Sequence, residues 1–157
     1  MQGELTELGR VLTLEASAVR QLTKALLGQR AAMVGDDPDG MEICVQGIRS
    51  SLLTMEEARR ARGRLLEVVA GDPDLALGRL ELMIRTPLPT FLCEARAALW
   101  QAAEGAAREA AINCAVLRQA IAGGEASLQA LLTAGDSSHG PREREQEPGG
   151  SPFDQTV

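Results

Sequence analysis

The sequence has very few aromatic residues and no tyrosine. Only Phe91, Trp100 and Phe153 are aromatic, which amounts to 2% of the 157 residues. Sheet proteins rely on aromatic and β-branched side chains, so this composition argues against a β-rich fold. Hydrophobic residues nevertheless make up 45% of the chain, which is enough to form a core. We therefore expect an all-α protein.

Histidine and paired cysteines are also scarce. The single histidine is His139, and the three cysteines, Cys44, Cys93 and Cys114, are far apart. This distribution contains no C-x-x-C zinc pattern and no Ser-His-Asp or Cys-His set, and there is no glycine-rich phosphate loop. The sequence thus predicts no catalytic residue, no metal and no cofactor, and it predicts free thiols of a reducing compartment.

Basic residues are outnumbered, 16 to 22, so the net charge is −6. Nucleic-acid binding needs clustered positive charge, and a membrane-spanning helix needs roughly 18 or more apolar residues in succession; neither is present. The first ten residues, MQGELTELGR, lack the basic start and apolar run of a signal peptide. We expect a cytoplasmic, non-enzymatic protein that does not insert into membranes.

Turn signals rich in Gly, Pro, Asp and Thr divide the chain at residues 35–40, 71–74 and 86–90. In Asp-Pro-Asp the first aspartate can cap a helix, and proline fits the first helical turn. Asp37 and Asp72 are therefore predicted N-caps. The predicted helices cover residues 4–34, 38–70, 73–85 and 88–134.

Apolar residues in the long segments recur in steps of three, four and seven, as in a coiled coil. The stripe of the second segment includes Met41, Val45, Ile48 and Leu52. We predict an antiparallel, coiled-coil-like helical bundle of three long helices and one short helix. The last helix would be roughly 70 Å long if it is unbroken; the pair Gly123-Gly124 is the point at which it could break instead.

The composition changes at residue 135. Residues 135–157 are rich in Gly, Pro, Ser and charged residues, and they include five acidic residues but only two arginines. Such a segment cannot bury enough apolar surface to fold. The sequence thus predicts a bundle domain over residues 1–134 and a disordered acidic tail over 135–157.

Two charged segments have an ordinary structural interpretation. The acidic turn at residues 36–40 does not have the ligand spacing of a calcium loop. Glu56 is expected to pair with Arg59 and Arg60 at helical spacing. A site for an acidic partner remains the alternative for these arginines.

The end of the last helix carries a polar residue within an apolar face. Asn113 could set the register of the bundle or bond to a partner helix. The apolar residues that follow, Leu117, Ile121, Leu128, Leu131 and Leu132, could be core. Because this helix is longer than its neighbours, they could instead form an uncovered binding face.

Three stretches together resemble the FlgN family of flagellar export chaperones. Residues 22–35, LTKALLGQRAAMVG, resemble the end of its first helix; residues 48–69, IRSSLLTMEEARRARGRLLEVV, resemble its second helix. Residues 113–132, NCAVLRQAIAGGEASLQALL, resemble its last helix, and a loose Gly- and Pro-containing tail follows. The likeness covers most of residues 5–135.

The resemblance implies a cytoplasmic chaperone that binds the C-terminal helical regions of hook-associated proteins, which form the hook–filament junction. Such a chaperone prevents early assembly and delivers these proteins to the flagellar type III export gate. The implied binding stripe comprises Asn113, Leu117, Ile121, Leu128, Leu131 and Leu132. Many members dock at the gate through a tail tyrosine; here Phe153 is the candidate.

Two other functions fit the residues. A self-associating coiled-coil structural or adaptor protein would use the same free face for pairing. A helical mutase could clamp a dicarboxylate between Arg59 and Arg62, although no acid–base partner is evident in the sequence.

Overall fold

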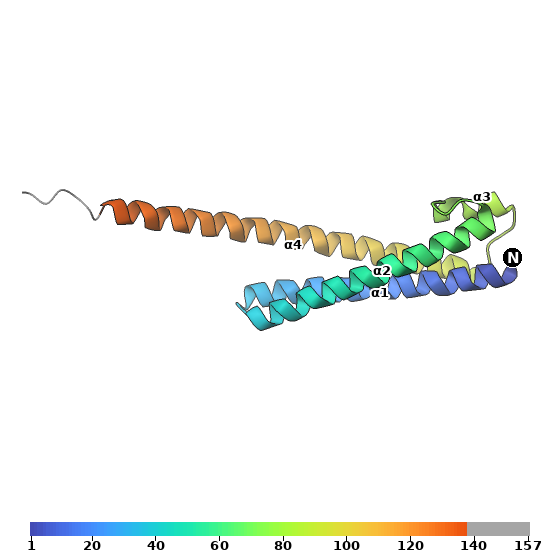
Figure 1. The fold of residues 1–157 in the computed structure, drawn as a ribbon, viewed down its shortest axis with the longest axis horizontal. Helices are drawn as coiled ribbons and strands as arrows, with labels where there is room; N and C mark the ends of the chain where they lie inside the picture. Colours follow the sequence, from blue (N-terminus) through green and yellow to red (C-terminus); the bar gives the residue numbers. More distant parts are fainter. Residues whose placement is uncertain (138–157) are drawn as a thin grey trace, which may run out of the picture. The chain divides into compact units, whose positions relative to one another are not determined.

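The computed structural model describes residues 1–137, with side chains up to residue 134, and contains helices but no strand over that range. The elements are α1 (Gln2–Val34), α2 (Pro38–Ala70), the 3₁₀ turn η1 (Leu77–Arg79), α3 (Leu80–Ile84) and α4 (Thr90–Ser137) (Figure 1). The all-α prediction of three long helices and one short helix is confirmed.

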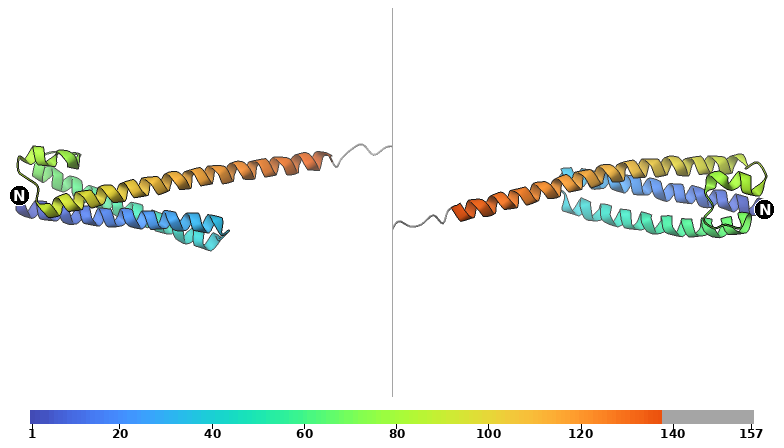
Figure 2. Two further views of the ribbon diagram at one scale, coloured as in Figure 1. Left: turned by 180° about the vertical axis from the view of Figure 1, so that it is seen from behind. Right: turned by 90° about the horizontal axis from the view of Figure 1, so that it is seen from above.

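The chain divides into two units, Met1–Leu117 and Arg118–Val157, with the boundary inside α4. In the first unit, α1 and α2 form an antiparallel hairpin, and the first part of α4 runs back alongside α1 (Figures 1 and 2). The described part of the second unit is the remainder of α4.

Asp37, in the turn between α1 and α2, is the N-cap of α2 as predicted. The Asp37 side chain accepts a hydrogen bond from the Gly40 N–H at 2.9 Å, and Pro38 occupies the first helical position. A carboxylate there also satisfies the positive end of the helix dipole. Gly71 ends the helix in the left-handed conformation with φ 72°, which glycine adopts without a Cβ penalty. Both ends of α2 therefore follow from local chemistry.

The predicted helix over residues 73–85 is wrong in its first part. Asp72 caps no helix: its Oδ1 accepts from the Asp74 N–H at 3.0 Å and its carbonyl accepts from the Leu75 N–H at 3.3 Å, forming a turn. Leu75 and Leu80 are both buried. In one continuous helix they would lie about 140° apart, so the loop and η1 are needed to turn both inward.

The core of the first unit lies mainly between α1, the first part of α4 and the α2 C-terminal half. Its largest fully buried side chains are Leu8, Leu12, Leu66, Leu80 and Leu92. They belong to one cluster that continues along α4 to Ala106. The buried α4 positions of this cluster are Leu92, Ala95, Leu99, Ala102 and Ala106, and the small alanines let α1 and α4 pack closely along the cluster.

Of the two alternatives for the last helix, the unbroken one is found: α4 continues through Gly123 and Gly124 to Ser137. The Ser127 hydroxyl donates to the Gly123 carbonyl at 2.9 Å inside this unbroken helix. Thus α4 ends beyond the boundary predicted at residue 134. The tail after residue 137, including Phe153, lies outside the described residues.

Candidate functional site

The apolar residues predicted to bind a partner lie on α4 and are exposed. Leu117, Ile121, Leu128, Leu131 and Leu132 have exposed fractions between 37% and 71%. Four of them follow steps of three, four or seven, so they share one side of the helix. We call these five residues the distal face of α4. A row of uncovered large apolar side chains is the usual mark of an interaction surface.

Asn113 does not belong to this exposed surface, because it is only 2% exposed. Its Nδ2 donates to the Leu26 carbonyl at 2.7 Å and to Gln29 Oε1 at 3.0 Å. Its Oδ1 accepts from Arg30 Nη1 at 3.3 Å. All of these partners are on α1, so Asn113 fixes α4 against α1, and we leave it out of the proposed partner surface.

An ion pair extends this polar contact. Arg30 Nη2 lies 2.7 Å from Glu109 Oε2, and both side chains are mostly covered. Glu109 lies about one helical turn before Asn113 on α4, just after Ala106, the last residue of the apolar core on this helix. Polar groups with fixed partners specify one register between helices. The cluster therefore holds α4 in register where the apolar packing ends.

Replacing Asn113 with alanine is expected to destabilise the protein by about 1–3 kcal/mol, because the buried Leu26 carbonyl loses its side-chain donor. Urea denaturation followed by circular dichroism measures the change. Cys114→Ala, at the exposed neighbouring position, is the matched control and should stay within about 0.5 kcal/mol of wild type. Equal effects of the two substitutions would show that Asn113 does not hold the helices together.

A buried ion pair crosses from α1 to α2. Arg62 Nη1 lies 2.7 and 2.6 Å from the two carboxylate oxygens of Glu15, which is 8% exposed. Burial raises the pKa of Glu15 above its usual value, and the nearby charge of Arg62 partly offsets this rise. Since Arg62 already binds a carboxylate of its own chain, the arrangement does not support the arginine clamp of a mutase.

The neighbouring charges behave as surface groups. The predicted Glu56–Arg60 pair is present, with Arg60 Nε 3.0 Å from Glu56 Oε1, and both side chains are exposed. No ion pair to Arg59 is found among the described residues. Exposed pairs of this kind contribute little to stability, so this part of α2 is a solvated face.

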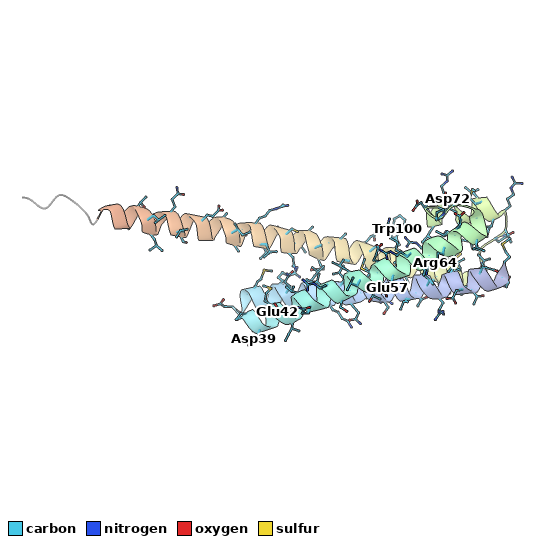
Figure 3. All side chains as sticks on the ribbon, in the orientation of Figure 1. Asp39, Glu42, Glu57, Arg64, Asp72 and Trp100 are labelled. Carbon is cyan, nitrogen blue, oxygen red and sulfur yellow. The ribbon has the colours of Figure 1, made fainter. Side chains whose placement is uncertain are left out.

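Sequence reasoning did not identify a groove beside η1. This hollow of about 890 Å³ is lined by Ala76 of the loop, by Leu77 of η1 and by α4 residues Leu99, Trp100 and Ala103. Trp100, the one tryptophan of the chain, is 67% exposed and is labelled in Figure 3. Leu99 and Ala102 belong to the core cluster, but Trp100 does not. A tryptophan outside the apolar stripe of its helix was the sequence feature that could have indicated an exposed groove.

The first half of α2 differs from its prediction as well. Val45 and Leu52, expected in the buried stripe, are exposed, whereas Ala58 and Leu66 in the second half are buried. Periodicity identified an apolar face of α2, but within the described residues only its second half packs into the core cluster.

The described part of the chain has no helix that is long and apolar enough to cross a membrane. In the same residues, no group of three or more His, Cys, Asp or Glu side chains could hold a metal ion. The chain matches no family model, no curated protein and no solved structure.

Proposed function

We propose that the protein is a non-enzymatic export chaperone of the FlgN type, which binds C-terminal helical segments of hook-associated proteins through the distal face of α4. The observation that carries this proposal is the exposure of Ile121, Leu128, Leu131 and Leu132, each at 60% or more. A helix binds such a face by laying its own apolar stripe along it.

The free energy of binding comes from apolar area removed from water. Burial contributes roughly 25 cal/mol per Å² of apolar surface, and fully burying one leucine contributes roughly 1.5–3 kcal/mol. Several leucines in one row therefore supply apolar burial that offsets the entropy lost when two chains associate, which is of comparable size. The apolar face of the client helix is buried in the same contact, and this burial prevents the client from assembling early with other subunits.

The remaining parts of the proposal rest on charge and on the tail. A net charge of −6 opposes non-specific aggregation of a chaperone that has an exposed apolar face. Cytoplasmic location and delivery to the flagellar export gate complete the proposed role. Phe153, the one aromatic residue of the predicted tail, is the proposed contact to the gate.

Calorimetric titration of the full chain with the C-terminal segments of the junction proteins from the same organism tests the function. We expect saturable binding close to one client per chaperone, with a negative heat-capacity change from apolar burial. Absence of binding to every segment, with folding confirmed by circular dichroism, would contradict the proposal.

Self-association is the second candidate function, because the distal face has the spacing of a coiled coil. Light scattering with and without client separates the two. A tight dimer that does not dissociate when client is added would favour a structural or adaptor subunit. A dimer that dissociates on client addition would favour the chaperone.

A further inference from the structure

The distal part of α4 has heptad spacing with a glycine in the middle. Leu117, Ile121, Gly124, Leu128 and Leu131 follow one another in steps of four, three, four and three, which is the seam of a two-stranded coiled coil. A Cβ atom added at Gly124 would meet no atom of the chain within 4 Å. Nothing within the described residues therefore requires a glycine here, although it weakens the helix.

A second copy supplies a reason for the glycine. When two such helices pair in antiparallel orientation, the N-terminal part of one apolar seam lies beside the C-terminal part of the seam of the second copy. Alignment of Leu117 with Leu128 of the second copy places Ile121 opposite Gly124 of that copy. By two-fold symmetry each of these contacts occurs twice. The large Ile121 side chain then fills the space that the missing Gly124 side chain leaves.

The flanking charges select this register. Arg118 and Glu125 follow the seam positions Leu117 and Gly124, so both flank the seam on the same side. In the alignment just described, Arg118 of each copy lies beside Glu125 of the other copy. A shift by one heptad in either direction would place Arg118 beside Arg118, or Glu125 beside Glu125. Like charges in these flanking positions are destabilising.

We propose that two copies of the protein pair through their distal faces as an antiparallel coiled coil, with Ile121 packed on Gly124 and Arg118 beside Glu125. This pairing covers the face to which the proposed function assigns the client. The second copy and the client are thus competing occupants, and the dimer shields the leucines until a client displaces it.

Charge reversal in the full chain, without any client, tests the register by sedimentation equilibrium. R118E or E125R alone should raise the dimer Kd roughly tenfold, because each creates two like-charge contacts. The double variant R118E/E125R should return the Kd to within roughly threefold of wild type, since the two pairs are restored in reverse. R108E, at an exposed α4 position before Asn113, is the control and should leave the Kd unchanged.

Cross-linking tests the alignment independently. In the proposed register Cys114, which is exposed, faces Leu131 of the second copy. In a background of C44S and C93S, the variant L131C should form a disulfide dimer with Cys114 under mild oxidation. The variant L128C, whose new thiol would face Leu117, should not form one.

Three results would overturn the pairing: a chain that stays monomeric at every concentration, single charge reversals with the Kd of wild type, or a Cys114–Cys114 cross-link without L131C. None of these decides the chaperone function, because client titration is measured separately. Conversely, a chain that dimerises as described but binds no client would retain the pairing and contradict the proposed function.

Discussion

Replacing both Ile121 and Leu128 with aspartate is expected to weaken client binding by at least roughly a hundredfold, which is about 2.7 kcal/mol. The change removes two apolar anchors and would bury two carboxylates without partners. Both side chains are exposed on the single chain and lie outside its core cluster, so the thermal midpoint of the bundle should stay nearly unchanged. Calorimetric titration and thermal denaturation of the same variant measure the two quantities.

The matched control places the same charges on the opposite side of the same helix. Gln119 and Ala126 are exposed and lie off the distal face, so Q119D/A126D adds equal charge without touching the leucines. Its client affinity should stay within roughly threefold of wild type. Equal loss of binding in both variants would mean that charge or helix stability, rather than the distal face, controls the interaction.

Replacing Arg62 with methionine is expected to destabilise the bundle by about 3 kcal/mol, because the buried Glu15 carboxylate would lose its partner. Replacing both residues, as E15M/R62M, should bring stability back to within about 1 kcal/mol of wild type, since a buried pair can be exchanged for apolar packing. Urea denaturation of wild type, both single variants and the double variant completes the cycle. Additive effects in the cycle would show that the two groups do not interact.

The same pair predicts a pH dependence of stability. The pKa of Glu15 is raised by burial in the folded chain, so the folded state binds its proton more tightly than the unfolded state. The stability from this group is therefore fully present below the unfolded value of about 4.3 and is lost as pH rises through the folded pKa. The free energy of unfolding of wild type relative to E15Q should fall over that interval. If the free energy of unfolding of wild type relative to E15Q instead rose with pH, the charge of Arg62 would lower the pKa of Glu15 by more than burial raises it.

Local chemistry decided which parts of the fold could be predicted. The bounds of α2 follow from Asp37-Pro38 at its start and Gly71 at its end, which act within one turn of the chain. The short helix was mispredicted because Leu75 and Leu80 both reach the core, and that requirement comes from α1 and α4. The glycine pair did not break α4, because the surrounding alanines and leucines favour helix strongly enough.

The candidate site divides in the same way. The periodicity of the last segment indicated an apolar face, but Asn113 and Leu117 look alike in such a pattern. Only the α1 groups at Leu26 and Gln29 decide that Asn113 is buried. Likewise the groove at Trp100 depends on the path of the chain through Ala76 and η1, which spacing along the sequence does not encode.

Hydrogen–deuterium exchange of the full chain, with and without a bound junction-protein segment, tests the central claim most directly. It distinguishes the two apolar surfaces, because amides over residues 118–134 and those over 73–78 and 96–107 fall in different peptides. The account predicts that client binding slows exchange over residues 118–134 and leaves the groove around Trp100 unchanged. Protection confined to the Trp100 groove, or no protection along α4 despite measured binding, would contradict it.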